Sequence, residues 1–194
     1  MKSIAETELQ KLLDVVTEMK ASPNYLESLE SIGKACVNTL RNKGKILWCG
    51  NGGSAADSQH LAGELVSRFN YDRPGLASVA LTTDTSILTS IGNDYGYERL
   101  FARQVEAIGN EGDVIIGIST SGRSGNVIEG FKTAREKGLV TVGFAGKNGA
   151  DMTALCDHII NIPSSETPKI QEGHIATGHI LCNYIETQIF PKQG

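Results

Sequence analysis

Residues 46–57 read ILWCGNGGSAAD, an apolar run followed by a glycine-rich turn and by a helical pattern that begins near Ser54. Glycine accepts positive φ angles and lets the backbone approach a ligand closely, and the free N–H groups at a helix N-terminus attract anions. The same order returns over 114–124, where the apolar run VIIGI leads into the polar loop STSGRS. Two such loops on neighbouring strands predict one phosphorylated ligand.

Helices and strands alternate along the rest of the chain. Apolar residues at helical spacing predict two helices on either side of a break at Ser22-Pro23-Asn24, which form a helical hairpin over residues 1–43. We then expect strands at 46–49, 77–81, 114–118, 140–144 and 158–162, and helices at 54–66, 85–91, 126–137 and 168–189. This alternation predicts an α/β fold with a doubly wound, five-stranded parallel sheet flanked by helices.

The length of 194 residues suits one domain and is short for two. We therefore expect a single domain over 1–194, made of the hairpin at 1–43 and a core with a last helix at 44–194. Right-handed crossovers place the carboxyl ends of the strands, and both polar loops, on one edge of the sheet. The hairpin carries more apolar surface than one small domain covers, which predicts a homo-oligomer.

Composition argues against several classes of protein. Asp and Glu number 22 against 18 Lys and Arg, without a long basic run, so we expect no nucleic-acid partner. The start of the chain lacks the apolar core of a signal peptide, and no stretch is long enough to span a bilayer, so we expect a cytoplasmic protein with no membrane partner. The four scattered cysteines form no C-x-x-C pair, which favours reduced, buried thiols.

The first loop also matches a dinucleotide-binding pattern, Gly50-x-Gly52-x-x-Ala55. That function requires an acidic residue at the tip of the second strand to bind the ribose. Asp84 is too far downstream for this task and is better placed as a helix N-cap. The chain has no GxxxxGK[ST] motif, which excludes a P-loop NTPase, and a tight turn without a ligand is the simplest alternative for this loop.

Four further side chains are spaced so that they can share a site. His60 and Glu64 lie four residues apart on one helical face and could act on one ligand or metal, or form a plain surface pair. Gln171 and His179 share a side of the last helix but are about 12 Å apart along its axis. They meet at one point only if Gln171 lies in an irregular first turn, or if adjacent subunits supply the two residues.

Several motifs in the same order indicate a family. Besides the two loops, the chain contains ALTTD at 80–84, IGNDYG at 91–96 and PKIQE at 168–172. With these motifs, over nearly its whole length, it resembles the sedoheptulose-7-phosphate isomerases of the sugar isomerase (SIS) domain family. The resemblance implies a flavodoxin-like SIS fold and a homotetramer that interconverts sedoheptulose 7-phosphate and D-glycero-D-manno-heptose 7-phosphate, the first step toward the ADP-heptose of the lipopolysaccharide core.

The resemblance also implies roles for single residues. The matching substrate-binding residues are Asn51, Gly52, Gly53, Glu64, Asn93, Asp94, Ser119, Thr120, Ser121, Ser124 and Gln171. The matching ligands of one Zn²⁺ per subunit are His60, Glu64, Gln171 and His179. Because aldose–ketose exchange through an enediol needs a base and an acid beside the substrate, we expect Glu64 and His179 to be the catalytic pair.

A non-catalytic SIS protein that binds a replication initiator is the alternative. Proteins of that kind share the fold and many of the motifs but lack the acid–base pair, whereas both Glu64 and His179 are present here. A regulator that senses sugar phosphates ranks third, because such proteins usually attach this domain to a DNA-binding one and the hairpin has no basic recognition face. We therefore expect an enzyme.

Overall fold

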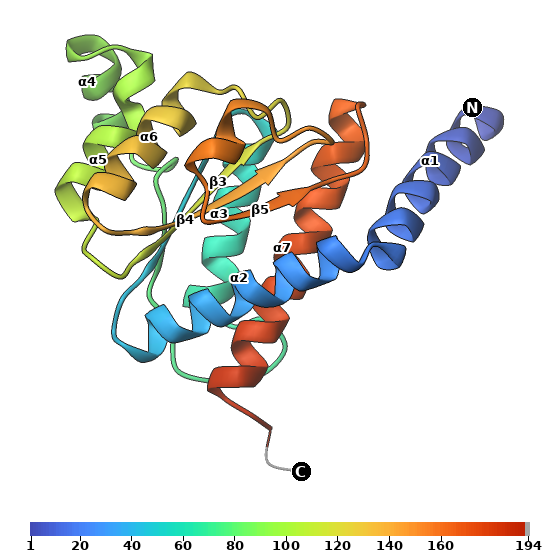
Figure 1. Ribbon diagram of the computed structural model, residues 1–194, viewed down its shortest axis with the longest axis horizontal. Coiled ribbons are helices and arrows are strands. Elements are labelled where there is room, and N and C mark those ends of the chain that lie inside the picture. The colour runs from blue at the N-terminus through green and yellow to red at the C-terminus, as the bar shows by residue number, and fades with distance from the viewer. Residues whose placement is uncertain (193–194) are drawn as a thin grey trace.

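Five parallel strands form the central sheet, in the order β2-β1-β3-β4-β5 (Figure 1). They are β1 (Ile46–Gly50), β2 (Ser78–Ala80), β3 (Val114–Ser119), β4 (Val140–Ala145) and β5 (His158–Asn161). The computed structural model describes residues 1–192. Every residue of β1 and β3 is buried, because helices cover both faces of the sheet. Gly50 pairs with Ile118, so the loops that follow β1 and β3 leave the sheet side by side.

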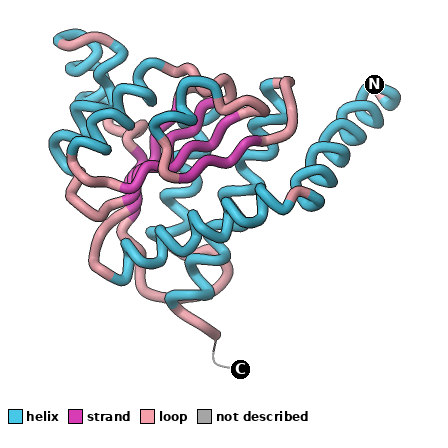
Figure 2. Tube along the Cα trace, in the orientation of Figure 1, coloured by secondary structure: helices cyan, strands magenta, loops and turns pink. Residues whose placement is uncertain are grey.

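Helices on both faces of the sheet give the molecule three layers (Figures 1 and 2). They are α1 (Lys2–Ala21), α2 (Pro23–Arg41), α3 (Gly53–Val66), α4 (Thr85–Asp94), α5 (Leu100–Ile108), α6 (Gly125–Glu136) and α7 (Thr167–Ile189), with 3₁₀ turns η1 (Tyr97–Arg99) and η2 (Ala150–Leu155). One core, which includes Trp48 and Leu61, lies between the sheet and α2, α3 and α7. The other, which includes Phe101 and Phe131, lies under α5 and α6.

The strands and helices expected from the sequence are confirmed, with ends that differ by at most about three residues. Asp84 caps α4 as expected, because its side chain accepts a hydrogen bond from Ile87 N at 3.0 Å. Helix α5 and the turn η1 before it are absent from the expected elements. They follow Gly96, whose φ of +86° lets the chain turn sharply after α4. The expected end of the domain at residue 194 lies outside the described residues.

The expected hairpin is present as two consecutive helices that meet at Ser22. The Ser22 hydroxyl accepts a hydrogen bond from Tyr25 N at 3.3 Å, and Pro23 begins α2. Helix α2 packs against the body, whereas α1 extends away from it (Figure 1). Of the residues of α1, only Val15 and Met19 are buried. Among the described residues, no helix combines the length and the apolar character that crossing a membrane requires.

Candidate functional site

The loops after β1 and β3 turn sharply and are tied to each other. Gly52 has a φ of +56° and Gly122 a φ of +65°, which glycine adopts without strain. The side-chain amides of Asn51 and Asn126 exchange two hydrogen bonds of 2.8 Å, so the first loop is fastened to helix α6. The Tyr97 hydroxyl donates to the same Asn51 oxygen at 2.8 Å. The two loops are therefore held in fixed relative positions.

Hydroxyl groups gather in the second loop, as the sequence predicts. Ser119 is buried at the end of β3, and its Oγ lies 2.8 Å from Ser124 Oγ and 3.5 Å from Ser121 Oγ. Ser124 is the N-cap residue of α6, but its side chain makes no capping hydrogen bond. The hydroxyls thus converge beside the N-terminus of a helix, where an anion is stabilised.

Two hollows flank these loops. The larger, of about 350 Å³, lies beside the first loop and is lined by residues that include Gly50, Asn51, Gly52, Thr82 and Tyr97. The smaller, of about 160 Å³, lies beside the second loop and is lined by residues that include Thr120, Ser121, Arg123, Lys147 and Ser164. The larger volume falls in the range of small-molecule sites, and the smaller hollow has two cationic side chains on its wall.

Gln171 belongs to this loop region. A Cβ atom added at Gly53 would overlap the side-chain amide of Gln171, so glycine at this position leaves room for that amide. Ile170, the preceding residue, lines the smaller hollow. By contrast, Asn93 and Asp94 at the end of α4 line neither hollow, and the Asn93 amide donates to the Asp94 carboxylate at 2.7 Å.

A second group of predicted residues meets where α3 and α7 pack together. His60 Nε2 lies 2.8 Å from His179 Nε2 and 3.5 Å from Glu64 Oε1. The helices approach closely because residue 178 is a glycine: a Cβ there would overlap the Leu61 side chain. The side chains of His60 and Glu64 are 47% and 23% exposed, so solvent and a ligand can reach them.

His174 on the same helix α7 is a structural residue. It is fully buried, and its Nε2–H donates to the Ala145 carbonyl oxygen at 3.1 Å. Burial lowers the pKa of His174 to about 4, so the imidazole is neutral at physiological pH.

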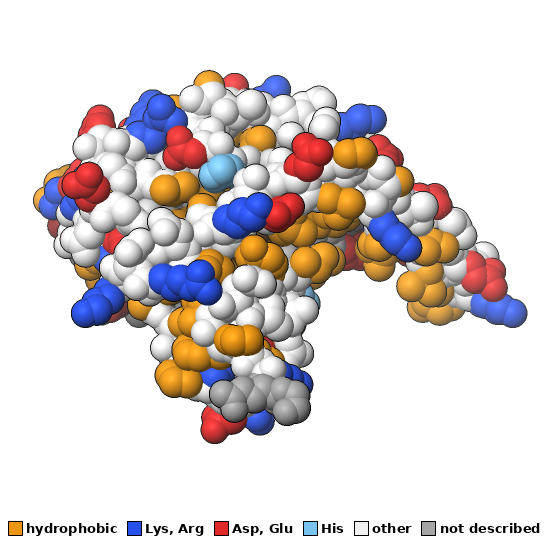
Figure 3. All heavy atoms as spheres, turned by 60° about the horizontal axis from the view of Figure 1, so that its bottom comes forward, with side chains coloured by type: hydrophobic (Ala, Val, Ile, Leu, Met, Phe, Trp, Pro, Cys, Tyr) orange, Lys and Arg blue, Asp and Glu red, His pale blue; other side chains and the backbone are white. Residues whose placement is uncertain are grey.

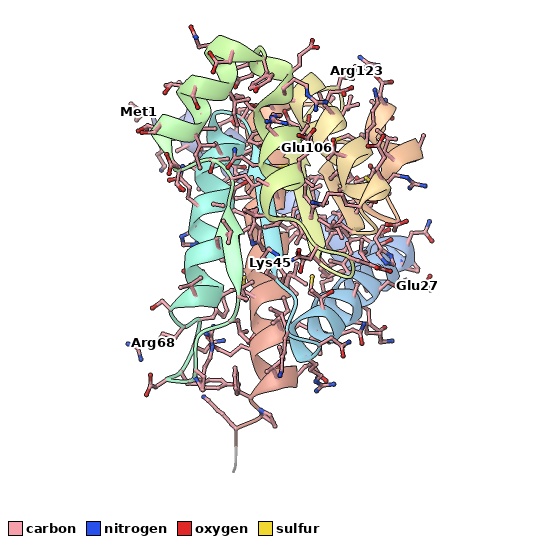
Figure 4. The ribbon with its side chains drawn as sticks, turned by 90° about the vertical axis from the view of Figure 1, so that its left-hand side faces the viewer. Met1, Glu27, Lys45, Arg68, Glu106 and Arg123 are labelled. Atoms are coloured by element: carbon pink, nitrogen blue, oxygen red, sulfur yellow. The ribbon has the colours of Figure 1, made fainter. Side chains whose placement is uncertain are left out.

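The two groups lie far apart within one chain. Glu64 follows Gly53 by 11 residues of α3, which is about 16 Å along the helix axis, and His179 follows Gln171 by about 12 Å of α7. Figure 4 shows this separation, because Arg123 of the second loop and Arg68, just after α3, lie at opposite ends of the molecule. A proton can be transferred directly only over about 3 Å. A sugar phosphate held at the loops of one chain therefore meets the Glu64–His179 cluster of that chain only if it spans this separation.

The distance between Gln171 and the other three predicted zinc ligands decides which of them can share one ion within a chain. Two imidazole nitrogens and a carboxylate oxygen are ligands that Zn²⁺ accepts, so the donor chemistry of His60, Glu64 and His179 fits the metal. Gln171 of the same chain is too far away to join them. In the described part of the chain, no group of three or more His, Cys, Asp or Glu is arranged to hold a metal ion.

Sequence reasoning did not single out three residues of these regions. Asn126 and Tyr97 fix Asn51, and the position of Asn126 at the start of the helix after the serine loop was an available signal. Asp57 is buried in α3 with one carboxylate oxygen unpartnered, and this burial raises its pKa. Tyr97 carries no signal in the sequence, because its contact is made 46 residues away.

Comparisons with known proteins identify the family of the chain. A family model, the SIS domain, matches residues 8–146. The phosphoheptose isomerase of Burkholderia pseudomallei (strain K96243) is 56% identical over 179 residues, which cover 92% of this chain and 91% of the relative. That of Aneurinibacillus thermoaerophilus is 52% identical over 190 residues, which cover 98% and 96%. The solved phosphoheptose isomerase of Neisseria gonorrhoeae superposes with a TM-score of 0.90 at 40% identity, covering 96% of this chain and 98% of that one. The chain belongs to the phosphoheptose isomerase family of SIS-domain proteins.

Proposed function

We propose that the chain is an aldose–ketose isomerase that interconverts sedoheptulose 7-phosphate and D-glycero-D-manno-heptose 7-phosphate. The observation that carries this proposal is the contact of His179 with His60, which places Glu64 and His179 in one cluster. The reaction needs one base and one acid beside the substrate, and this cluster offers both. The relatives, which are phosphoheptose isomerases, support the same reaction.

In the proposed mechanism the serine loop binds the phosphate group of the sugar. The hydroxyls of Ser119, Ser121 and Ser124 and the N-terminus of α6 stabilise its negative charge. Glu64 and His179 then divide the proton transfers. One removes the proton from the carbon next to the carbonyl while the other gives a proton to the carbonyl oxygen, which forms the enediol. The carbon-bound proton then goes to the former carbonyl carbon, while the hydroxyl group on the first carbon loses its proton and becomes the new carbonyl group.

We infer that each site combines residues from two copies of the chain in a homotetramer. The separation of about 16 Å along α3 supports this, because a second copy can bring its acid–base pair to the loops of the first. Exposed apolar side chains also support an interface, among them Leu9, Leu13 and Val16 on α1, Leu26 on α2 and Ile180 beside His179. Figure 3 shows hydrophobic side chains gathered along α1 and on the adjoining face of the body.

We further propose one Zn²⁺ per subunit, held by His60, Glu64 and His179 after these three side chains rearrange, together with Gln171 of a second copy. When bound, zinc supplies a Lewis acid that polarises the carbonyl group of the sugar. The imidazoles and the carboxylate of this chain also orient the substrate and exchange its protons.

A cytoplasmic location is part of the same proposal. The four cysteines are free thiols, and Cys36, Cys49 and Cys182 are buried. Unpaired thiols persist in a reducing compartment.

Incubation with sedoheptulose 7-phosphate in deuterated water, followed by NMR, tests the proposed function. We expect an aldoheptose 7-phosphate to form with the wild type, and Glu64→Gln or His179→Ala to lower kcat by about 10²–10⁴-fold each. Phosphate affinity and the fold are expected to stay close to those of the wild type in both variants. No isomerisation by the wild type, with or without zinc, would indicate a non-catalytic binding protein instead.

A further inference from the structure

A buried ion pair joins the segment after α3 to the end of α7. Arg73 Nε donates to Glu186 Oε1 at 3.1 Å, and the two side chains are 2% and 0% exposed. The backbone N–H groups of Phe69 and Asn70 donate to the same carboxylate at 2.9 and 2.8 Å. Burial alone would raise the pKa of Glu186, but these donors hold it below its usual range, so the carboxylate is charged.

Arg73 also completes the C-terminus of α3. Its Nη2 donates to the Glu64 carbonyl oxygen at 2.9 Å, and its Nη1 donates to those of Leu65 and Ser67 at 2.6 and 3.1 Å. The last carbonyl groups of a helix lack partners within it, and the last turn of α3 has no basic residue of its own. The guanidinium group therefore fixes the backbone of Glu64, one member of the proposed acid–base pair.

Glu186, the carboxylate of the ion pair, is linked to His179, the other member of the proposed acid–base pair. Glu186 holds the backbone of Phe69, whose ring centroid lies 5.7 Å from that of His179. The Asn70 side chain donates to Asn183 Oδ1 at 2.8 Å, one turn of α7 after His179. The segment fastened by Glu186 thus forms a wall beside the His179 ring.

We propose that Arg73 and Glu186 are positioning residues, which fix Glu64 and His179 at the separation that proton transfer requires. This inference rests on the proposed function. A buried ion pair is a weak source of stability, because the desolvation of both charges offsets their attraction. An apolar pair of the same volume would fill the space, but it could not donate to the Glu64 carbonyl or accept from the Phe69 N–H. A displacement of about 1 Å in an active site costs about 10²-fold in rate.

Asp113 offers a matched control. Like Glu186, it is a buried carboxylate that accepts from two backbone N–H groups, those of Lys45 and Asn110, and pairs with a cation, Lys45 Nζ. It precedes β3, and its side chain bonds only to Lys45 and Asn110, not to α3, α7 or the segment of residues 67–73, among the described residues. Glu186→Gln and Asp113→Asn each remove one charge at nearly constant volume, so we expect both to lower Tm to a comparable degree.

The two variants are compared with the wild type in the isomerase assay, at a temperature where circular dichroism shows all three folded. We expect Glu186→Gln to lower kcat by about 10²-fold with KM within about twofold, and Asp113→Asn to keep both constants within about twofold. Arg73→Lys keeps the charge but lacks the guanidinium N–H groups that reach the Glu64 carbonyl oxygen, so we expect its kcat to be about tenfold lower than that of the wild type. If Glu186→Gln does not fold, Arg73→Lys takes its place in the comparison with Asp113→Asn. Equal kcat losses in Glu186→Gln and Asp113→Asn, or unchanged kcat in Arg73→Lys, would overturn the proposal.

A readout without turnover separates this proposal from the isomerase assignment. In protein labelled with ¹³C-histidine, the Phe69 ring shifts the His179 resonance, which the variant His179→Ala identifies by its loss. We expect Glu186→Gln or Arg73→Lys to move this resonance and Asp113→Asn to leave it in place. An unmoved resonance in Glu186→Gln and Arg73→Lys overturns the positioning role even if the wild type is active. A wild type that is inactive but shows the expected shifts contradicts the isomerase assignment and leaves the structural coupling supported.

Discussion

Acidification should destabilise the fold through His174, the buried imidazole of α7. Its Nε2–H donates to the Ala145 carbonyl oxygen, whereas its Nδ1 atom is buried without a hydrogen-bond partner. A proton added at Nδ1 would place a charge in an apolar interior, and this is why burial lowers the pKa of His174 to about 4. In the unfolded chain the same group has a pKa near 6.5.

The size and sign of the effect follow from these two pKa values. Because the folded pKa is the lower one, the unfolded chain binds more protons between the two values, and the free energy of unfolding falls as the pH falls from about 6.5 to about 4. A tenfold difference in proton affinity corresponds to about 1.4 kcal/mol. Between about pH 7 and about pH 5, His174 therefore lowers the free energy of unfolding by about 2 kcal/mol per chain.

Urea unfolding at a fixed protein concentration, compared between the wild type and His174→Gln, measures this quantity. Glutamine can still donate to Ala145 but does not titrate, so the carboxylates that also respond to pH, such as Asp57 and Glu186, cancel in the comparison. We expect the difference in free energy of unfolding between the two proteins to change by about 2 kcal/mol from pH 7 to pH 5. A difference that stays constant over this range would refute the assignment of His174 as a buried neutral base.

Three further expectations concern the site. The double variant Ser121→Ala, Ser124→Ala should raise KM for the sugar phosphate with little change in Tm; a wild-type KM would place the phosphate elsewhere. In Gly53→Ala the added methyl group should displace the Gln171 amide and lower kcat/KM by at least about tenfold. Gly53→Ala should leave Tm nearly unchanged, and full activity would exclude Gln171 from the site. Elemental analysis of protein purified without chelator should find one zinc per chain, and the variant His60→Ala should contain none. Metal-free protein whose activity is unchanged by added zinc and by chelator would contradict the zinc proposal.

The fold was largely predictable because its signals are local. Apolar runs bounded by glycine turns mark β1 and β3, and the helical patterns that follow them mark α3 and α6. Helix α5 was missed. It begins directly after a 3₁₀ turn whose end supplies its N-cap, Arg99, and the Arg99 side chain makes no capping hydrogen bond. The direction of α1 was not predictable, since it depends on contacts distant in sequence, such as the ion pairs of Lys11 with Glu166, the N-cap residue of α7, at 2.9 Å and of Glu8 with Lys169 at 3.3 Å.

The site was predictable only where its residues are close in sequence. The serine loop and the pair His60–Glu64 each lie within one turn or one loop, so spacing alone brings them together. The contact between His60 and His179 spans 119 residues and depends on how α3 packs on α7 at Gly178. That contact followed from the family resemblance, whereas nothing in the sequence pointed to the ion pair of Arg73 with Glu186.

The most direct test of the shared site is complementation between two variants, assayed at a substrate concentration well below the raised KM of the serine variant, where each variant alone has little activity. Glu64→Gln keeps the serine loop, and the double variant Ser121→Ala, Ser124→Ala keeps the acid–base pair. When the two are unfolded together and refolded as mixed oligomers, a site built from two copies should be intact in about a quarter of cases, so we expect activity to rise toward about a quarter of the wild-type value. If every site were built from one chain, no intact site would form, and a mixture as inactive as its components would contradict the account.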